Sequence, residues 1–63
     1  MTKKDYEMFA ECIKKSQNVD GLSEAEKEGL MLGLKRVAIK FSVEARMDNE
    51  RFNQSMFLKA CGF

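Results

Sequence analysis

The side chains that most often perform catalysis are scarce in this sequence. It contains no His, the usual general base, and only two cysteines, Cys12 and Cys61. Without a His, neither thiol has the partner that normally activates a nucleophile, and their wide separation does not match zinc-ligand spacing. The acidic residues are scattered, and no Gly-rich phosphate loop is present. We therefore predict that the chain is not an enzyme and binds no metal or cofactor.

The same two cysteines bear on the compartment. The N-terminal residues lead into an amphipathic segment rather than an apolar signal sequence, and no stretch approaches the length of a membrane span. Cysteines without a secretion signal are typical of a reducing cytosol. We expect a cytoplasmic protein without a membrane contact, in which Cys12 and Cys61 are buried thiols rather than a disulfide.

Basic residues gather in one stretch and acidic residues in another. Residues 20–28 carry a net charge of −3, whereas residues 35–46 carry +3 from Lys35, Arg36, Lys40 and Arg46 against Glu44. This order complements a helix dipole, and it also offers a basic patch to an acidic partner. The overall pI of about 7.7 is below the value of about 9 that is typical of dedicated nucleic-acid modules. Nucleic acid is therefore a partner that we do not favour.

Composition indicates that the cysteines and the charged residues are positioned by helices. The 63 residues include no Pro and only four Gly, and the periodicity predicts an all-α, three-helix domain spanning residues 1–63. The helices are expected at about 3–16, 24–47 and 54–61. Capping boxes are predicted at Thr2 with Asp5 and at Ser23 with Glu26, while Asn53 precedes the last helix and Gly62 ends it.

The expected helix at 24–47 is long for so small a protein and carries two apolar stripes. The first contains Leu30, Leu34, Val37 and Phe41, flanked by Met31, Ala38 and Ala45. The second lies nearly opposite and contains Leu32, Ile39, Val43 and Met47. A helix that is apolar on two sides is normally covered on both. We therefore predict a long central helix in a homodimer whose interface includes the second stripe; a monomer in which the short helices wrap both sides is the alternative.

The other two helices supply the facing apolar positions. Tyr6, Phe9, Ala10 and Ile13 share one side of the first helix, with Met8 and Cys12 outside that stripe. Phe52 and Phe57 have the spacing of a hydrophobic staple around Asn53. Gly29 and Gly33, four residues apart in the expected long helix, are interpreted either as tolerated surface residues or as the site of a close helix crossing.

Both ends of the chain resemble a group of small phage and prophage proteins. Residues 1–6 are similar to their Met-Thr-Lys-Lys-Asp-Tyr opening, and residues 51–62 to their Arg-Phe-Asp-x-x-x-Phe-Leu-x-Ala-Cys-Gly ending. Asn53 stands where Asp is usual, and Asn49-Glu50 where an Asn-Pro pair is common. The resemblance implies a small helical phage protein, without an agreed activity and without transferable site residues.

Three binding functions remain after catalysis is set aside. The first is a phage accessory protein that binds and modulates a host protein, as an anti-defence inhibitor would. The second is a small dimeric DNA-binding regulator that uses the basic residues of the long helix. The third is a sponge for a small ligand such as a nucleotide, held at an oligomer interface. The excess apolar surface and the near-neutral charge favour the first.

Overall fold

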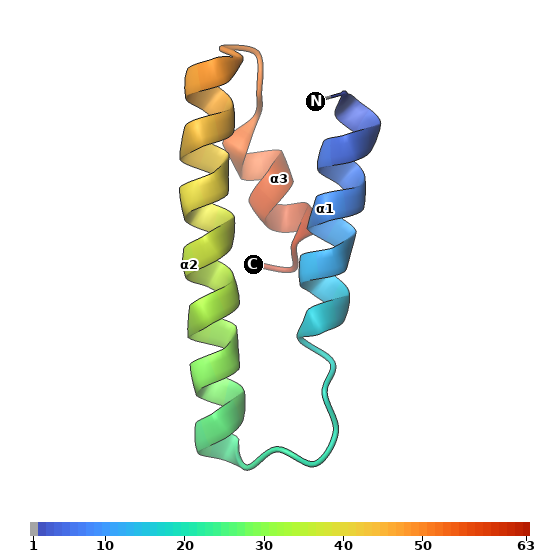
Figure 1. The fold of residues 1–63 in the computed structure, drawn as a ribbon, viewed down its shortest axis with the longest axis vertical. Helices are drawn as coiled ribbons and strands as arrows, with labels where there is room; N and C mark the ends of the chain where they lie inside the picture. Colours follow the sequence, from blue (N-terminus) through green and yellow to red (C-terminus); the bar gives the residue numbers. More distant parts are fainter. Residues whose placement is uncertain (1) are drawn as a thin grey trace.

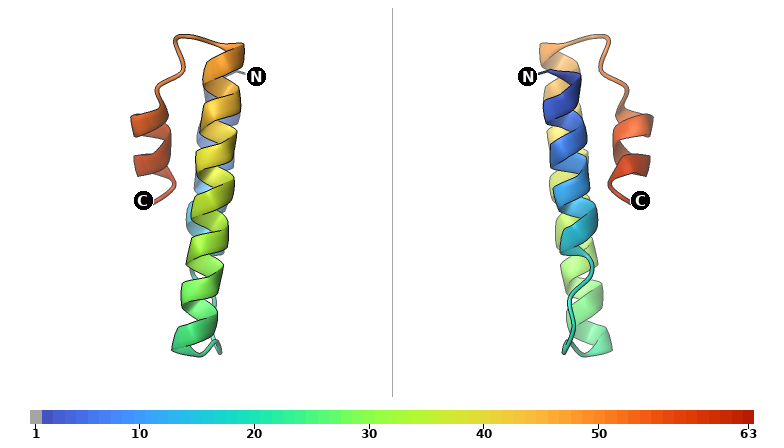
Figure 2. Two further views of the ribbon diagram at one scale, coloured as in Figure 1. Left: turned by 90° about the vertical axis from the view of Figure 1, so that its left-hand side faces the viewer. Right: turned by 90° about the vertical axis from the view of Figure 1, so that its right-hand side faces the viewer.

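The computed structural model describes residues 2–63 as three α-helices, with Met1 of the opening motif outside the described residues. They are α1 (Lys3–Ser16), α2 (Glu24–Asp48) and α3 (Gln54–Ala60). Helices α1 and α2 run antiparallel side by side, and α3 packs on one side of this pair (Figures 1 and 2). The all-helical prediction is confirmed for these residues, with α2 one residue longer and α3 one residue shorter than expected.

The helix ends follow the predicted capping chemistry. The Thr2 and Ser23 hydroxyls accept hydrogen bonds from the amides of Asp5 at 3.3 Å and Glu26 at 3.2 Å. The two carboxylates accept bonds from the backbone amides of their cap residues, and these bonds lower the pKa of Asp5 and of Glu26. Such reciprocal caps satisfy amides that a helix start leaves without partners.

The connections bend at glycine, and the chain end is tied back to α1. Gly21, in the loop of residues 17–23, and Gly62, which follows the α3 C-cap Cys61, have φ of 84° and 92°. Only glycine adopts this left-handed region without strain, so both turns require it. The Gln17 side-chain amide donates a hydrogen bond to the Cys61 carbonyl, which joins the end of α1 to the end of α3.

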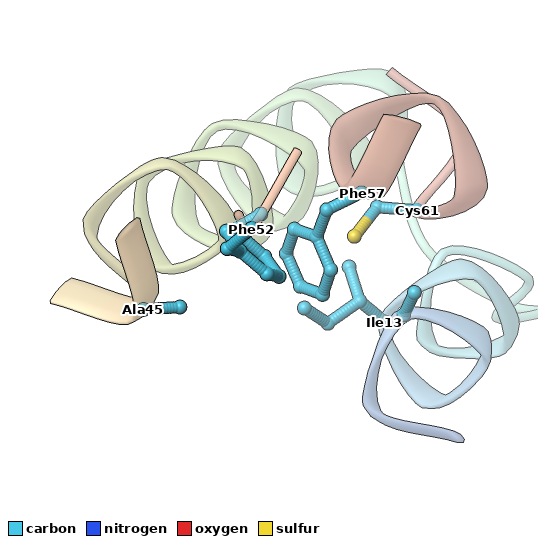
Figure 3. Packing of buried hydrophobic residues seen from close by; sticks show 7 residues of the cluster. Ile13, Ala45, Phe52, Phe57 and Cys61 are labelled. Carbon is cyan, nitrogen blue, oxygen red and sulfur yellow. The ribbon is translucent and has the colours of Figure 1, made fainter. Parts of the chain in front are cut away.

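The core combines aromatic rings with smaller side chains, and Figure 3 shows two of its rings, Phe52 and Phe57, beside Ile13, Ala45 and Cys61. The Phe52 and Phe57 rings lie 5.5 Å apart, which confirms the predicted staple, and Phe9 meets Phe41 at 4.5 Å. Aromatic pairs at such distances contribute beyond the area that they bury. The buried apolar residues are Ala10, Ile13, Ala38, Ala45, Phe52, Phe57 and Cys61.

Three side chains lie elsewhere than the stripes suggested. Val37 and Met31 are exposed, because α1 and α3 both pack on the side of α2 that carries Ala38 and Ala45. Those two alanines, predicted only to flank the stripe, are buried instead. Cys12, expected to be a buried thiol, is exposed on α1. The position of Val37 was wrong because periodicity defines a stripe without saying where its neighbours cross. The buried-thiol prediction for Cys12 was wrong because it rested on the general preference of cysteine for burial, whereas periodicity had placed Cys12 outside the stripe.

One polar residue of α2 is also buried. The Ser42 hydroxyl donates to the Ile39 carbonyl at 2.8 Å and accepts from the Gln54 side chain at 3.4 Å. Its bonds satisfy the hydroxyl, so α3 can pack closely on this side of α2 without leaving a polar group unpaired. All the buried residues of α2 (Ala38, Ser42 and Ala45) therefore lie in its second half.

Candidate protein-binding surface

The side of α2 that faces away from α1 and α3 carries four apolar side chains in solvent. We call Leu32, Ile39, Val43 and Met47 the outer face. Their exposed fractions are 69%, 42%, 43% and 76%. At about 100° per residue they fall within about 80° of one another, roughly opposite Ala38 and Ala45. The second stripe predicted from the sequence is thus left uncovered by the rest of the chain.

The outer face is long enough to hold a partner element. From Leu32 to Met47 it extends about 22 Å along the helix at 1.5 Å per residue. Scattered exposed apolar residues are ordinary, but four along one helix side, interrupted only by Arg36 in the turn between Leu32 and Ile39, resemble the pattern that helix-binding surfaces use. The arrangement can bind a second helix or a complementary apolar surface.

The four residues of the predicted basic patch lie on or beside this face. Lys35, Arg36, Lys40 and Arg46 are all exposed. By helix geometry Lys35 and Arg46 lie along one border and Lys40 along the other, whereas Arg36 lies within the face, between Val43 and Met47 in angle. The apolar side chains therefore have basic residues on both margins. This arrangement suits a partner with an apolar stripe and acidic margins better than one continuous phosphate backbone.

None of these charges is neutralised by a neighbour within residues 2–63. Among those residues the only ion pair joins Lys15 to Glu11 at 3.3 Å on α1. The acidic residues at the start of α2, including Glu24 and Glu28, are likewise exposed. The outer surface of α2 thus has an acidic first quarter and a basic middle, both available to a partner.

Gly29 and Gly33 lie beside this face with open space around them. A Cβ added at either position meets nothing within 4 Å. The close helix crossing considered from the sequence is therefore not made within the described chain. Each glycine costs α2 up to about 1 kcal/mol relative to Ala without an intramolecular packing gain.

Two shallow grooves lie elsewhere on the surface, and the sequence did not reveal them. One, about 580 Å³, runs between α1 and α3 past Tyr6, Phe52 and Met56. Another, about 440 Å³, lies between α1 and α2 beside Phe9 and Val37. Both are open to solvent rather than enclosed. Their lining depends on how the helices cross, which the sequence pattern does not specify.

The remaining reactive groups do not assemble into a site. Burial raises the pKa of the Cys61 thiol, which keeps it protonated and a poor nucleophile. Both cysteines are free thiols. Within residues 2–63 no three His, Cys, Asp or Glu residues lie close enough to share a metal ion.

None of the helices formed by residues 2–63 combines the length and the apolar character needed to cross a bilayer. Comparison of the chain with protein-family models, curated proteins and solved structures finds no match.

Proposed function

We propose that this protein is a small accessory protein that binds another protein through the outer face of α2 and modulates it. The observation that carries the proposal is the exposure of Leu32, Ile39, Val43 and Met47 along one side of a 25-residue helix. Leaving such a row in water forgoes the free energy of burying it, so a partner that covers it gains that energy. The chain itself works as a homodimer with α2 at its centre.

The resemblance of both chain ends to phage proteins supplies the class of partner. We propose a cytoplasmic host protein, with an anti-defence enzyme as the first candidate. The partner surface should be apolar with acidic margins, to match the basic residues that border the outer face.

Site-specific photo-crosslinking tests this function. A photoreactive phenylalanine analogue replaces Val43 or Met47 in the outer face, and a matched control replaces Met56, which is 65% exposed on α3. Irradiation in the bacterial host should give one discrete adduct from the α2 positions and none from Met56. The adduct partner, once purified, should bind the wild type and lose that binding with Val43→Asp. Adducts of equal yield at all three positions contradict the proposal.

A DNA-binding regulator is the second candidate, because Lys35, Arg36, Lys40 and Arg46 are all exposed on one helix. Phosphate contacts are strongest at low ionic strength. A mobility-shift assay at about 50 mM salt should therefore show a complex if this candidate is correct, and its absence there removes it.

A further inference from the structure

We infer that the first half of α2 pairs antiparallel with the same segment of a second copy, in a register set by charge. The twofold axis of this pair passes between Met31 and Leu32. The inference rests on the proposed function in using the outer face, and it divides that face. Leu32 and Ile39 contact the second copy, whereas Val43 and Met47 stay free for another partner.

Charge along α2 selects this register. The first turns carry Glu24, Glu26 and Glu28 against Lys27, whereas residues 29–43 contain Lys35, Arg36 and Lys40 and no acidic residue. In a twofold antiparallel pair, residue i of one copy meets residue j of the other and j meets i. An axis near residue 31 or 32 therefore sets the acidic segment of each copy against the basic segment of the other.

The same axis places opposite charges of the two copies against each other along each border of the outer face. Glu28 and Lys35 are seven residues apart, two helical turns, and so share one border. A twofold axis perpendicular to the helices brings this border onto its own counterpart, and Glu28 then faces Lys35 of the second copy twice. On the opposite border Glu26 lies within one turn of both Arg36 and Lys40 of the second copy.

The apolar contacts fit this register too. Leu32, the second most exposed residue of the outer face, meets Leu32 of the second copy beside the axis. Ile39 lies over Ala25 of the second copy, and the methylene stem of Arg36 passes over Gly29. A Cβ added at Gly29 would meet nothing within 4 Å, so this stem has room there. The charge match remains the main support for the register.

A register centred on the middle of the outer face is the competing arrangement. It buries more apolar surface, because Leu32 then meets Val43 of the second copy. It also brings Lys35, Arg36 and Lys40 of both copies together around the axis with no acidic residue between residues 29 and 43. Like charges placed together oppose association, which favours the offset register.

The offset register leaves part of each α2 unpaired. Val43 faces residue 20 of the second copy, before the start of its α2 at Glu24, and Met47 extends further. The dimer therefore presents Val43 and Met47 at two symmetric positions. The paired segment, residues 24–39 of each copy, is about 24 Å long, and a single helix pair covers less than the roughly 800 Å² per partner of standard stable interfaces. We expect a dimer that dissociates on dilution.

Charge-swap variants of the full chain test the register by sedimentation equilibrium between about 5 and 500 μM in 50 mM salt. Wild type should show a monomer–dimer equilibrium that Leu32→Asp abolishes. Glu28→Lys and Lys35→Glu should each weaken self-association about tenfold. A one-to-one mixture of these two variants should form a heterodimer of near wild-type affinity, because each border then pairs opposite charges again.

Arg46→Glu is the matched control. Arg46 lies on the same border as Lys35, but the offset register places it beyond the α2 of the second copy, so dimerisation should not change. Weakening by Arg46→Glu without weakening by Lys35→Glu identifies the competing register. A monomeric wild type at 500 μM, or no heterodimer in the mixture, overturns the inference. Crosslinked adducts at Val43 and Met47 would still support the proposed function in that case. The two proposals can therefore be contradicted independently of each other.

Discussion

The two ends of this protein are built differently. Where α3 packs, Phe52 and Phe57 lie beside Ile13 of α1 and Ala45 of α2 (Figure 3), and Phe57 also contacts the Phe9 and Phe41 rings. At the other end, α2 faces α1 and the loop of residues 17–23 without α3 (Figure 1), and no residue from 24 to 37 is buried. The first end is held by tertiary packing, whereas the second depends on helix caps and on whatever covers it. Stability is therefore expected to be uneven along α2.

The largest effect is expected from truncating the aromatic end. Phe57 is 5% exposed and contacts three other rings, so Phe57→Ala should cost about 3–5 kcal/mol of unfolding free energy. Urea unfolding followed by circular dichroism measures it. Since that loss can unfold so small a chain, Phe57→Leu, at about 1–1.5 kcal/mol, gives a measurable companion. The neighbouring Met56→Ala should stay within about 0.5 kcal/mol; equal losses at both positions contradict the described packing.

Removing the N-terminal cap of α2 should destabilise only the weakly packed end of the protein, where α2 begins. Ser23→Ala deletes the hydroxyl that accepts the Glu26 amide, a loss of about 1 kcal/mol. Hydrogen exchange should show faster exchange of amides in the first two turns of α2 and unchanged protection around Phe57. A uniform loss of protection along the chain would instead show that the two ends open as one unit.

Replacing a glycine at the weakly packed end should stabilise the monomer. Gly29→Ala meets no neighbouring atom, so the gain in helix propensity, up to about 1 kcal/mol, is uncompensated. Thermal unfolding at a few micromolar, where self-association is minimal, measures it. Gly62→Ala is the contrast, because its φ of 92° makes any side chain there destabilising. A loss of stability with Gly29→Ala at this dilution would reveal an intramolecular contact.

The smallest effect is expected on the pH dependence of stability, through the capping carboxylates of α1 and α2. Hydrogen bonds from Ser23 lower the pKa of Glu26 in the folded chain, so its contribution is present above the unfolded pKa near 4.5 and is lost as pH falls through the folded pKa. Stability should therefore decline on acidification, and Glu26→Gln should flatten part of that decline. Asp5→Asn supplies the same comparison at α1, where Thr2 lowers the pKa of Asp5. If both variants lose stability on acidification as the wild type does, the capping carboxylates are not the cause of that loss.

Local chemistry in the sequence predicted the helix ends well. A cap needs only residues within one turn, so Thr2 with Asp5 and Ser23 with Glu26 could be identified without knowing the fold. The placement of Val37 depends on where α1 and α3 cross α2, which no periodicity encodes. The outer face was found in advance because its residues lie opposite the core stripe. The grooves beside α1 could not be found, because they arise from helix packing.

The fastening of the chain end to α1 by Gln17 and Cys61 also has a consequence for synthesis in the cell. Phe52, Phe57 and Cys61, three of the buried apolar residues, are translated after α1 and α2. At about 5–20 residues per second the stretch from the start of α1 to the end of α2 takes roughly 2–9 s, and the core is incomplete throughout that time. The nascent chain thus presents both apolar sides of α2 until α3 emerges. A nonsense mutation between α2 and α3 would leave a product that proteases remove.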